Sequence, residues 1–166
     1  MIILFGEGIL FEFVFSEPIL HQKLQRRVLD HDNFGSALAN SLAKVFSGDM
    51  EREQLYSLFV EVMRKSYHDG DMTVSEACLT DLTVIKARDP ACEGLLHAFL
   101  NYKGFKALAS HRIAHVLWNE GRRHLALTVQ SLCSDIFAVD IHPAARIGTG
   151  NSYSLPSLRQ LSRTYD

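Results

Sequence analysis

Two aspartates stand where a carboxylate could face a ligand or a histidine. The first, Asp89, lies in Arg88-Asp89-Pro90. Because proline disfavours a helical conformation in the residue before it, we expect Asp89 on a bend and not inside a helix. A carboxylate on a bend is well placed to face a ligand. On pattern alone, the simpler interpretation is that Asp89 caps the next helix.

The second aspartate, Asp140, precedes Ile141-His142-Pro143. A buried acid near a histidine can fix its tautomer and stabilise its charged form, which is the orienting role in an acid–base dyad. Because neighbouring residues on a strand point to opposite sides, we do not expect His142 as the partner, and Asp140 would need a histidine from elsewhere in the fold. The alternative is that Asp140 caps the junction of helix and coil.

A pair of histidines, His111 and His115, is four residues apart and would share one face of a helix. Two such imidazoles could bind a metal. However, Arg112 stands where the zinc-protease motif has its glutamate, and the sequence offers no evident third ligand. The pattern therefore favours helix packing with hydrogen-bonded histidines, and we expect no metal.

Most of the chain is predicted to form helices, and these must position the side chains named above. Apolar residues recur at helical spacing, and polar or capping residues separate the segments. Asp32 or Asn33 is expected to cap the second helix, and Thr73 and Glu76 form the capping box of the fourth. The first helix is predicted to start at Ser16-Glu17-Pro18 and to end at His31-Asp32-Asn33. The second is predicted to end near Ser47-Gly48-Asp49 and the third at His68-Asp69-Gly70-Asp71. Two later helices are predicted over about 105–120 and about 122–137.

The periodicity changes at Val139–Gly150, where Ile141 and Ile147 stand six residues apart with small residues between and after them. A six-residue repeat of aliphatic and small residues is typical of a parallel β-helix. One or two rungs without stacking partners should leave Ile141 and Ile147 partly exposed. We expect residues 151–166 to be poorly ordered.

The overall composition narrows the function classes. The 166 residues suit a single domain, and a net charge of −2 gives no electrostatic support for nucleic-acid binding. The three cysteines form no C-x-x-C pair, which argues against a zinc site or a disulfide framework. Glu7 and Glu12 interrupt the apolar segment 1–15, so we expect neither a signal peptide nor a membrane anchor. We therefore expect a cytoplasmic location.

Three longer runs resemble the serine O-acetyltransferases, the hexapeptide-repeat acyltransferases that begin cysteine biosynthesis. These runs are Ala87-Arg88-Asp89-Pro90-Ala91; Lys103-Gly104-Phe105-Lys106-Ala107-Leu108 continuing through Arg112-Ile113-Ala114-His115 and Leu117-Trp118-Asn119-Glu120-Gly121-Arg122; and Val139-Asp140-Ile141-His142-Pro143-Ala144-Ala145-Arg146-Ile147-Gly148. The resemblance implies a mainly α fold: a multi-helix N-terminal domain that ends in the start of a left-handed parallel β-helix. The expected division is an off-pattern apolar segment over 1–15, the helical domain over 16–138, the first β-helix rungs over 139–150 and an off-pattern tail over 151–166.

The resemblance also implies a reaction, the transfer of an acetyl group from acetyl-CoA to the hydroxyl of L-serine. Asp89 matches the aspartate that holds the serine amino group, and Asp140 matches the one that orients a histidine general base. Acetyl-CoA is a co-substrate, and no bound cofactor is implied. The family's partners would be further copies of the chain, joined through the helical domain, and cysteine synthase.

The chain departs from the family pattern after Gly150. Tyr153, Ser154 and Leu155 stand where the family has Leu-Asp-His, so the histidine base is missing. The later coils for CoA and the tail that docks cysteine synthase are missing as well. We therefore expect an incomplete form with little or no activity. The alternatives are a non-catalytic helical oligomerisation module and an unrelated helical ligand-binding protein that uses His111 and His115.

Overall fold

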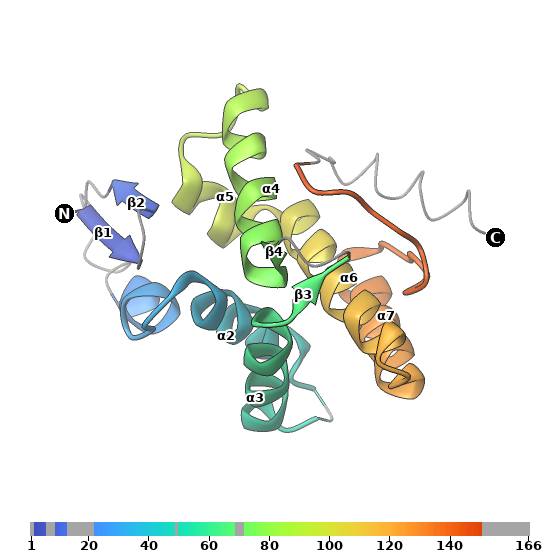
Figure 1. The fold of residues 1–166 in the computed structure, drawn as a ribbon. Coiled ribbons are helices and arrows are strands. Elements are labelled where there is room, and N and C mark those ends of the chain that lie inside the picture. The colour runs from blue at the N-terminus through green and yellow to red at the C-terminus, as the bar shows by residue number, and fades with distance from the viewer. Residues whose placement is uncertain (1, 6–8, 13–21, 49, 69–71, 151–166) are drawn as a thin grey trace.

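The computed structural model describes residues 2–5, 9–12, 22–48, 50–68 and 72–150. These residues form a mainly α-helical domain with two short antiparallel hairpins (Figure 1). In the first hairpin, β1 (Ile2–Phe5) pairs with β2 (Ile9–Glu12). Within the described residues, no helix combines the length and the apolar character that crossing a bilayer requires. The predicted helix start at Ser16-Glu17-Pro18 and the predicted disorder of 151–166 lie outside the described residues.

The helices follow one another with short connections, close to the predicted bounds. A π-helical turn, η1 (Gln25–Leu29), is followed by α2 (Phe34–Phe46), α3 (Arg52–Met63), α4 (Val74–Arg88), α5 (Leu95–Asn101), α6 (Lys103–Asn119) and α7 (Arg123–Phe137). Both predicted caps are confirmed. The Asn33 side chain accepts a hydrogen bond from the Ser36 amide, and the Thr73 hydroxyl accepts one from the Glu76 amide, each within a full capping box.

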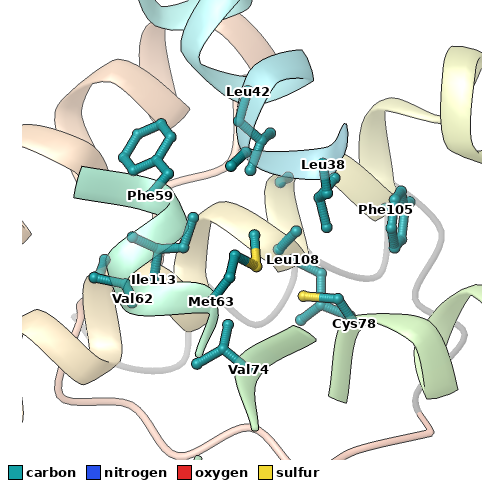
Figure 2. Close-up of a cluster of buried hydrophobic side chains, with 14 of the residues drawn as sticks. Leu38, Leu42, Phe59, Val62, Met63, Val74, Cys78, Phe105, Leu108 and Ile113 are labelled. Carbon is teal, nitrogen blue, oxygen red and sulfur yellow. The ribbon is translucent and has the colours of Figure 1, made fainter. Parts of the chain in front are cut away.

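Helix α6 lies at the centre of the domain and is buried on every side from Gly104 to Leu117. Its sequence therefore lacks the apolar stripe of a surface helix. Figure 2 shows part of the core around it, with side chains from α2, α3, α4 and α6. The labelled side chains are Leu38 and Leu42 from α2, Phe59, Val62 and Met63 from α3, Val74 and Cys78 from α4, and Phe105, Leu108 and Ile113 from α6.

Helix α7 packs along α6 and has an apolar face of Ala126, Val129, Cys133 and Phe137. It ends at Ala138, whose φ of 54° is in the left-handed region that turns a chain out of a helix. The chain then returns over the helices as the segment 139–150, drawn in orange-red in Figure 1.

Segment 139–150 alternates between buried and exposed residues, although none of it is a β-strand. The buried positions are Val139, Ile141, Pro143, Ala145 and Ile147. The expectation that Ile141 and Ile147 are partly exposed is wrong, because their side chains are only 4% and 5% exposed and belong to the helical core. The helices cover the apolar side of this segment, where a β-helix would use a stacked coil.

Candidate functional site

Two histidines of α6 hold segment 139–150 against the helical domain. The Nδ1 atom of His115 lies 2.7 Å from the carbonyl oxygen of Pro143, and Nε2 of His111 lies 3.1 Å from that of Ala145. Each ring nitrogen donates its hydrogen to the carbonyl oxygen. These bonds join every second residue of the segment to successive turns of α6.

Between the two histidines, Arg112 forms a buried ion pair with Asp81 of α4. Its Nε donates to Oδ2 over 2.8 Å and its Nη2 to Oδ1 over 2.9 Å, and both side chains are at most 1% exposed. Arg112 also donates to the carbonyl oxygens of Ile147, over 3.2 Å, and Gly148, over 2.8 Å. Oδ1 of Asp81 accepts a further hydrogen bond from the Gly150 amide over 2.9 Å. Both members of the pair therefore bind the backbone of 147–150, Arg112 at carbonyl oxygens and Asp81 at an amide.

A second hairpin, β3 (Ser66–Tyr67) with β4 (Met72–Thr73), supplies two more contacts. The Tyr67 hydroxyl donates to the Ile147 carbonyl oxygen over 2.8 Å, and Nε2 of His68 lies 3.0 Å from the same oxygen. The Arg112 guanidinium lies 4.6 Å from the centre of the Tyr67 ring, within cation–π range. We call Tyr67, His68, Asp81 and Arg112 the clamp.

Burial sets the protonation of the α6 histidines. It lowers the pKa of His111 to about 3, with the charge of His115 as the next cause. Burial also lowers the pKa of His115. Both rings are therefore neutral near pH 7, as their single donated hydrogen requires. The prediction that they serve helix packing through hydrogen bonds is confirmed; among the described residues, no group of three His, Cys, Asp or Glu side chains is arranged to hold a metal.

Asp89 lies where α4 ends, with an extended backbone (φ −95°, ψ 109°), so the predicted bend is confirmed. The prediction that it caps the next helix is wrong, because α5 begins after Gly94 without a side-chain cap. Instead, the Asp89 carboxylate accepts a hydrogen bond from the Ala91 amide over 2.9 Å. Desolvation raises the pKa of Tyr102 to about 12, with a hydrogen bond to Asp89 and that carboxylate's charge as further causes.

Asp140 is exposed, on the opposite side of segment 139–150 from Val139 and Ile141. Its carboxylate accepts a hydrogen bond from Nε2 of Gln130 on α7, over 2.6 Å. The predicted cap on the junction of helix and coil is therefore replaced by a link to the side of the preceding helix.

As predicted, His142 does not pair with Asp140. The reason inferred from the sequence, that the two side chains point to opposite sides, is wrong. The alternation of the segment places residues two apart on the same side, so both are exposed. They are separated because His142 has its own partners: its ring packs edge-on against Trp118 at 4.8 Å, and its Nδ1 accepts from the Ala144 amide over 3.1 Å.

The described contacts do not bring Asp89 and Asp140 together. Each carboxylate is held by its own local partner, and the groups that gather around segment 139–150 are the clamp and the α6 histidines. Sequence reasoning missed Tyr67, Asp81 and Gln130. The one available signal was Asp81, an acid at a core-facing position of α4, next to Leu82.

A helical domain whose last helix leads into a docked segment with a six-residue apolar repeat has the architecture of the N-terminal part of a hexapeptide-repeat acyltransferase. The comparisons with known proteins identify the family within this class. The family described as "Serine acetyltransferase, N-terminal" matches residues 12–110. The chain therefore belongs to the serine acetyltransferase family.

Relatives agree with this assignment in sequence and in structure. A probable serine acetyltransferase 1 of Oryza sativa subsp. japonica is 45% identical over 136 residues, which are 81% of this chain and 43% of the relative. The structure of the soybean serine acetyltransferase complexed with serine has a TM-score of 0.73 and 41% identity, over 81% of this chain and 54% of that one. A serine acetyltransferase in complex with CoA has a TM-score of 0.74 and 36% identity, over 81% and 56%. The chain spans about half the length of these proteins or less.

Proposed function

We propose that this chain provides the serine-binding, helical part of a serine O-acetyltransferase. The reaction would transfer the acetyl group of acetyl-CoA to the hydroxyl of L-serine and give O-acetylserine, in the biosynthesis of cysteine. The observation that carries the proposal is the likeness, over 81% of this chain, to a soybean enzyme complexed with serine. The CoA complex of another relative supports acetyl-CoA as the co-substrate.

Within this proposal, the two aspartates have different tasks. Asp89, on the bend after α4, would hold the ammonium group of serine. Its carboxylate is half-buried and keeps acceptor capacity beyond the Ala91 amide and the Tyr102 hydroxyl. Asp140 would orient a histidine general base, since a serine hydroxyl is a weak nucleophile until a positioned base takes its proton. The Gln130 amide keeps the Asp140 carboxylate in place for this task.

Among the described residues, the Asp140 carboxylate bonds to Gln130 and not to a histidine base. At the positions of the family's Leu-Asp-His, which lie outside the described residues, this sequence has Tyr153, Ser154 and Leu155. Losing a general base lowers the rate by about 10²–10⁴-fold. We therefore propose that this form has little or no acetyltransferase activity by itself.

The test is the release of free CoA thiol by the purified 166-residue chain with acetyl-CoA and L-serine. We expect no release above that of a blank without serine. Release that is lost in both Asp89→Ala and Asp140→Ala would show that the chain is active and that the missing-base argument is wrong. His142 would then be the first residue to test as a replacement base. Release that neither substitution changes would contradict the assigned roles.

A non-catalytic assembly module is the second candidate function. The observation that favours it is that the described helices share one hydrophobic core, part of which Figure 2 shows, and that segment 139–150 contributes residues to it. We propose that such a domain associates with further copies of itself or with longer subunits of its family. A cytoplasmic location stays a prediction. Light scattering after size exclusion tests the module, and a monomer that does not mix with a longer family member would contradict it.

A further inference from the structure

Three cations act electrostatically on a fourth, Lys106 of α6: Arg27 of η1, Lys23 just before η1, and Lys103 of α6. We call these four residues the cation cluster. Lys106 is in the first turn of α6, and its side chain is only 7% exposed. Its ammonium group donates to the carbonyl oxygen of Leu100, near the end of α5, over 2.6 Å. This bond uses one of three N–H donors, so a buried ammonium group keeps unused hydrogen-bonding capacity.

The charged groups that act on Lys106 are all positive. Burial lowers the pKa of Lys106 to about 8, and the charges of Arg27, Lys23 and Lys103 lower it further. Arg27 is half-buried, while Lys23 and Lys103 are exposed. We call the two less exposed residues, Lys106 and Arg27, the buried end of the cluster, and the two exposed lysines, Lys23 and Lys103, its exposed end.

Arg27 gives an independent sign that a partner is missing. Its Nε atom is buried and has no hydrogen-bond partner. Burial and the charge of Arg52 lower its pKa. The ion pairs found among the described residues involve Lys65, Arg112 and Arg122, and none of the four cations. Buried charges are normally paired, and a buried donor without a partner destabilises the fold, more so when it is charged.

We propose that Lys23, Arg27, Lys103 and Lys106 form a binding site for an oxyanion, the phosphate or carboxylate group of a small molecule. The buried end offers directed donors, from the Arg27 Nε and the Lys106 ammonium group, and arginine donors suit the oxygens of both groups. The exposed lysines at the other end attract the anion and remain open to solvent. The site is independent of the proposed acetyl transfer, because it uses neither aspartate and no part of segment 139–150.

The test is the thermal midpoint of the purified chain at pH 7 with sodium phosphate, sodium citrate or sodium chloride at equal ionic strength. Equal ionic strength removes general screening, so a saturable rise above the chloride value reports binding to the folded state. Phosphate and citrate as separate arms distinguish the two oxyanion groups. We expect a rise with at least one of them. Midpoints with phosphate and citrate equal to the chloride value would overturn the proposal.

Substitutions locate the site. We expect Lys106→Met to fold, because it removes a buried cation from a cluster of cations, and to lose the anion-dependent rise. Lys23→Met and Lys103→Met change exposed residues that carry no folding risk, and each should weaken anion binding about three- to tenfold. Lys44→Met, at an exposed lysine of α2, is the matched control and should bind as the unsubstituted chain does. An unchanged rise in Lys23→Met and Lys103→Met, or an equal loss in the control, would show that the anion acts elsewhere.

Discussion

Arg112 and Asp81 form a buried, two-pronged ion pair that also bonds to the backbone of 147–150. The guanidinium reaches the carbonyl oxygens of Ile147 and Gly148, and the carboxylate accepts from the Gly150 amide. A buried pair is not by itself a strong source of stability, because both charges lose their hydration. Here the pair also makes hydrogen bonds to backbone groups that are not paired in a strand. Its structural role therefore goes beyond the attraction between the two charges.

Arg112→Met should lower the free energy of unfolding by about 3–5 kcal/mol, because it leaves the Asp81 carboxylate buried and unpaired. Asp81→Leu combined with Arg112→Met should lose less than Arg112→Met alone. Urea unfolding followed by circular dichroism measures both. Lys65→Met is the control, because its pairs with Glu61 and Glu120 are partly exposed and should contribute at most about 1 kcal/mol. Equal losses from Lys65→Met and Arg112→Met would contradict this role.

The free energy of unfolding should fall as the pH drops below about 6.5, because of His111 and His115. Folding lowers the pKa of both rings, that of His111 to about 3, so only the unfolded chain takes up their protons in this range. The stabilisation is complete above about pH 6.5, the unfolded value. Below it, His111 loses about 1.4 kcal/mol per pH unit as the pH falls towards 3, and His115 adds to the loss in the same direction. The charged or titratable groups that act on His111 are His115 and Arg112, and those that act on His115 are His68, Arg146 and Arg112.

Urea midpoints at pH 7.5, 6.5 and 5.5 measure this dependence above the range in which most carboxylates titrate. Combining His111→Gln with His115→Gln should flatten it. His124→Gln, at an exposed position of α7, should leave the slope unchanged. A slope that survives the double substitution would place the titrating groups elsewhere.

Thr73→Ala should lower the free energy of unfolding by about 1 kcal/mol, because the hydroxyl caps the Glu76 amide at the start of α4. The matched control is Thr128→Ala. That hydroxyl donates to the His124 carbonyl within α7, where the loss should be under about 0.5 kcal/mol. Chemical denaturation of the two variants side by side makes the comparison, and an equal effect would argue against the cap.

One thiol of the folded chain should react readily with an aromatic disulfide reagent, and three after denaturation. Burial raises the pKa of Cys78 and Cys133 to about 12, so neither supplies thiolate near neutral pH, whereas Cys92 is partly exposed. Cys92→Ser should remove the fast phase seen by absorbance. Rapid reaction of two or three thiols would show that the core opens. The same reagent reports CoA release, so that assay is best made with Cys92→Ser.

The helices could be read from the sequence because their signals are local. Asn33 and the Thr73–Glu76 box mark helix starts through contacts three residues apart, and both were predicted correctly. The bend at Asp89 follows from Pro90 in the same way. Such signals do not depend on the rest of the fold.

The clamp could not be read from the sequence, because its contacts join residues far apart in the chain. The Tyr67 hydroxyl and the Ile147 carbonyl are 80 positions apart, and Asp81 and Gly150 are 69 apart. The same limitation explains the error at Ile141 and Ile147. Their spacing predicts an apolar side correctly, but a repeat says nothing about which element covers it.

Gly150 gives the end of the docked segment a fixed direction. Its φ of +73° favours glycine, and its amide is bonded to Asp81. The first coil of a parallel β-helix has no earlier coil to pair with. Its contacts must therefore come from residues elsewhere in the chain, and contacts between distant residues form slowly. In this protein α6 takes the place of that earlier coil, because it bonds to the carbonyls of Pro143, Ala145, Ile147 and Gly148. The helical domain would thus serve as a folding template, on which any coil that continues from Gly150 starts in register.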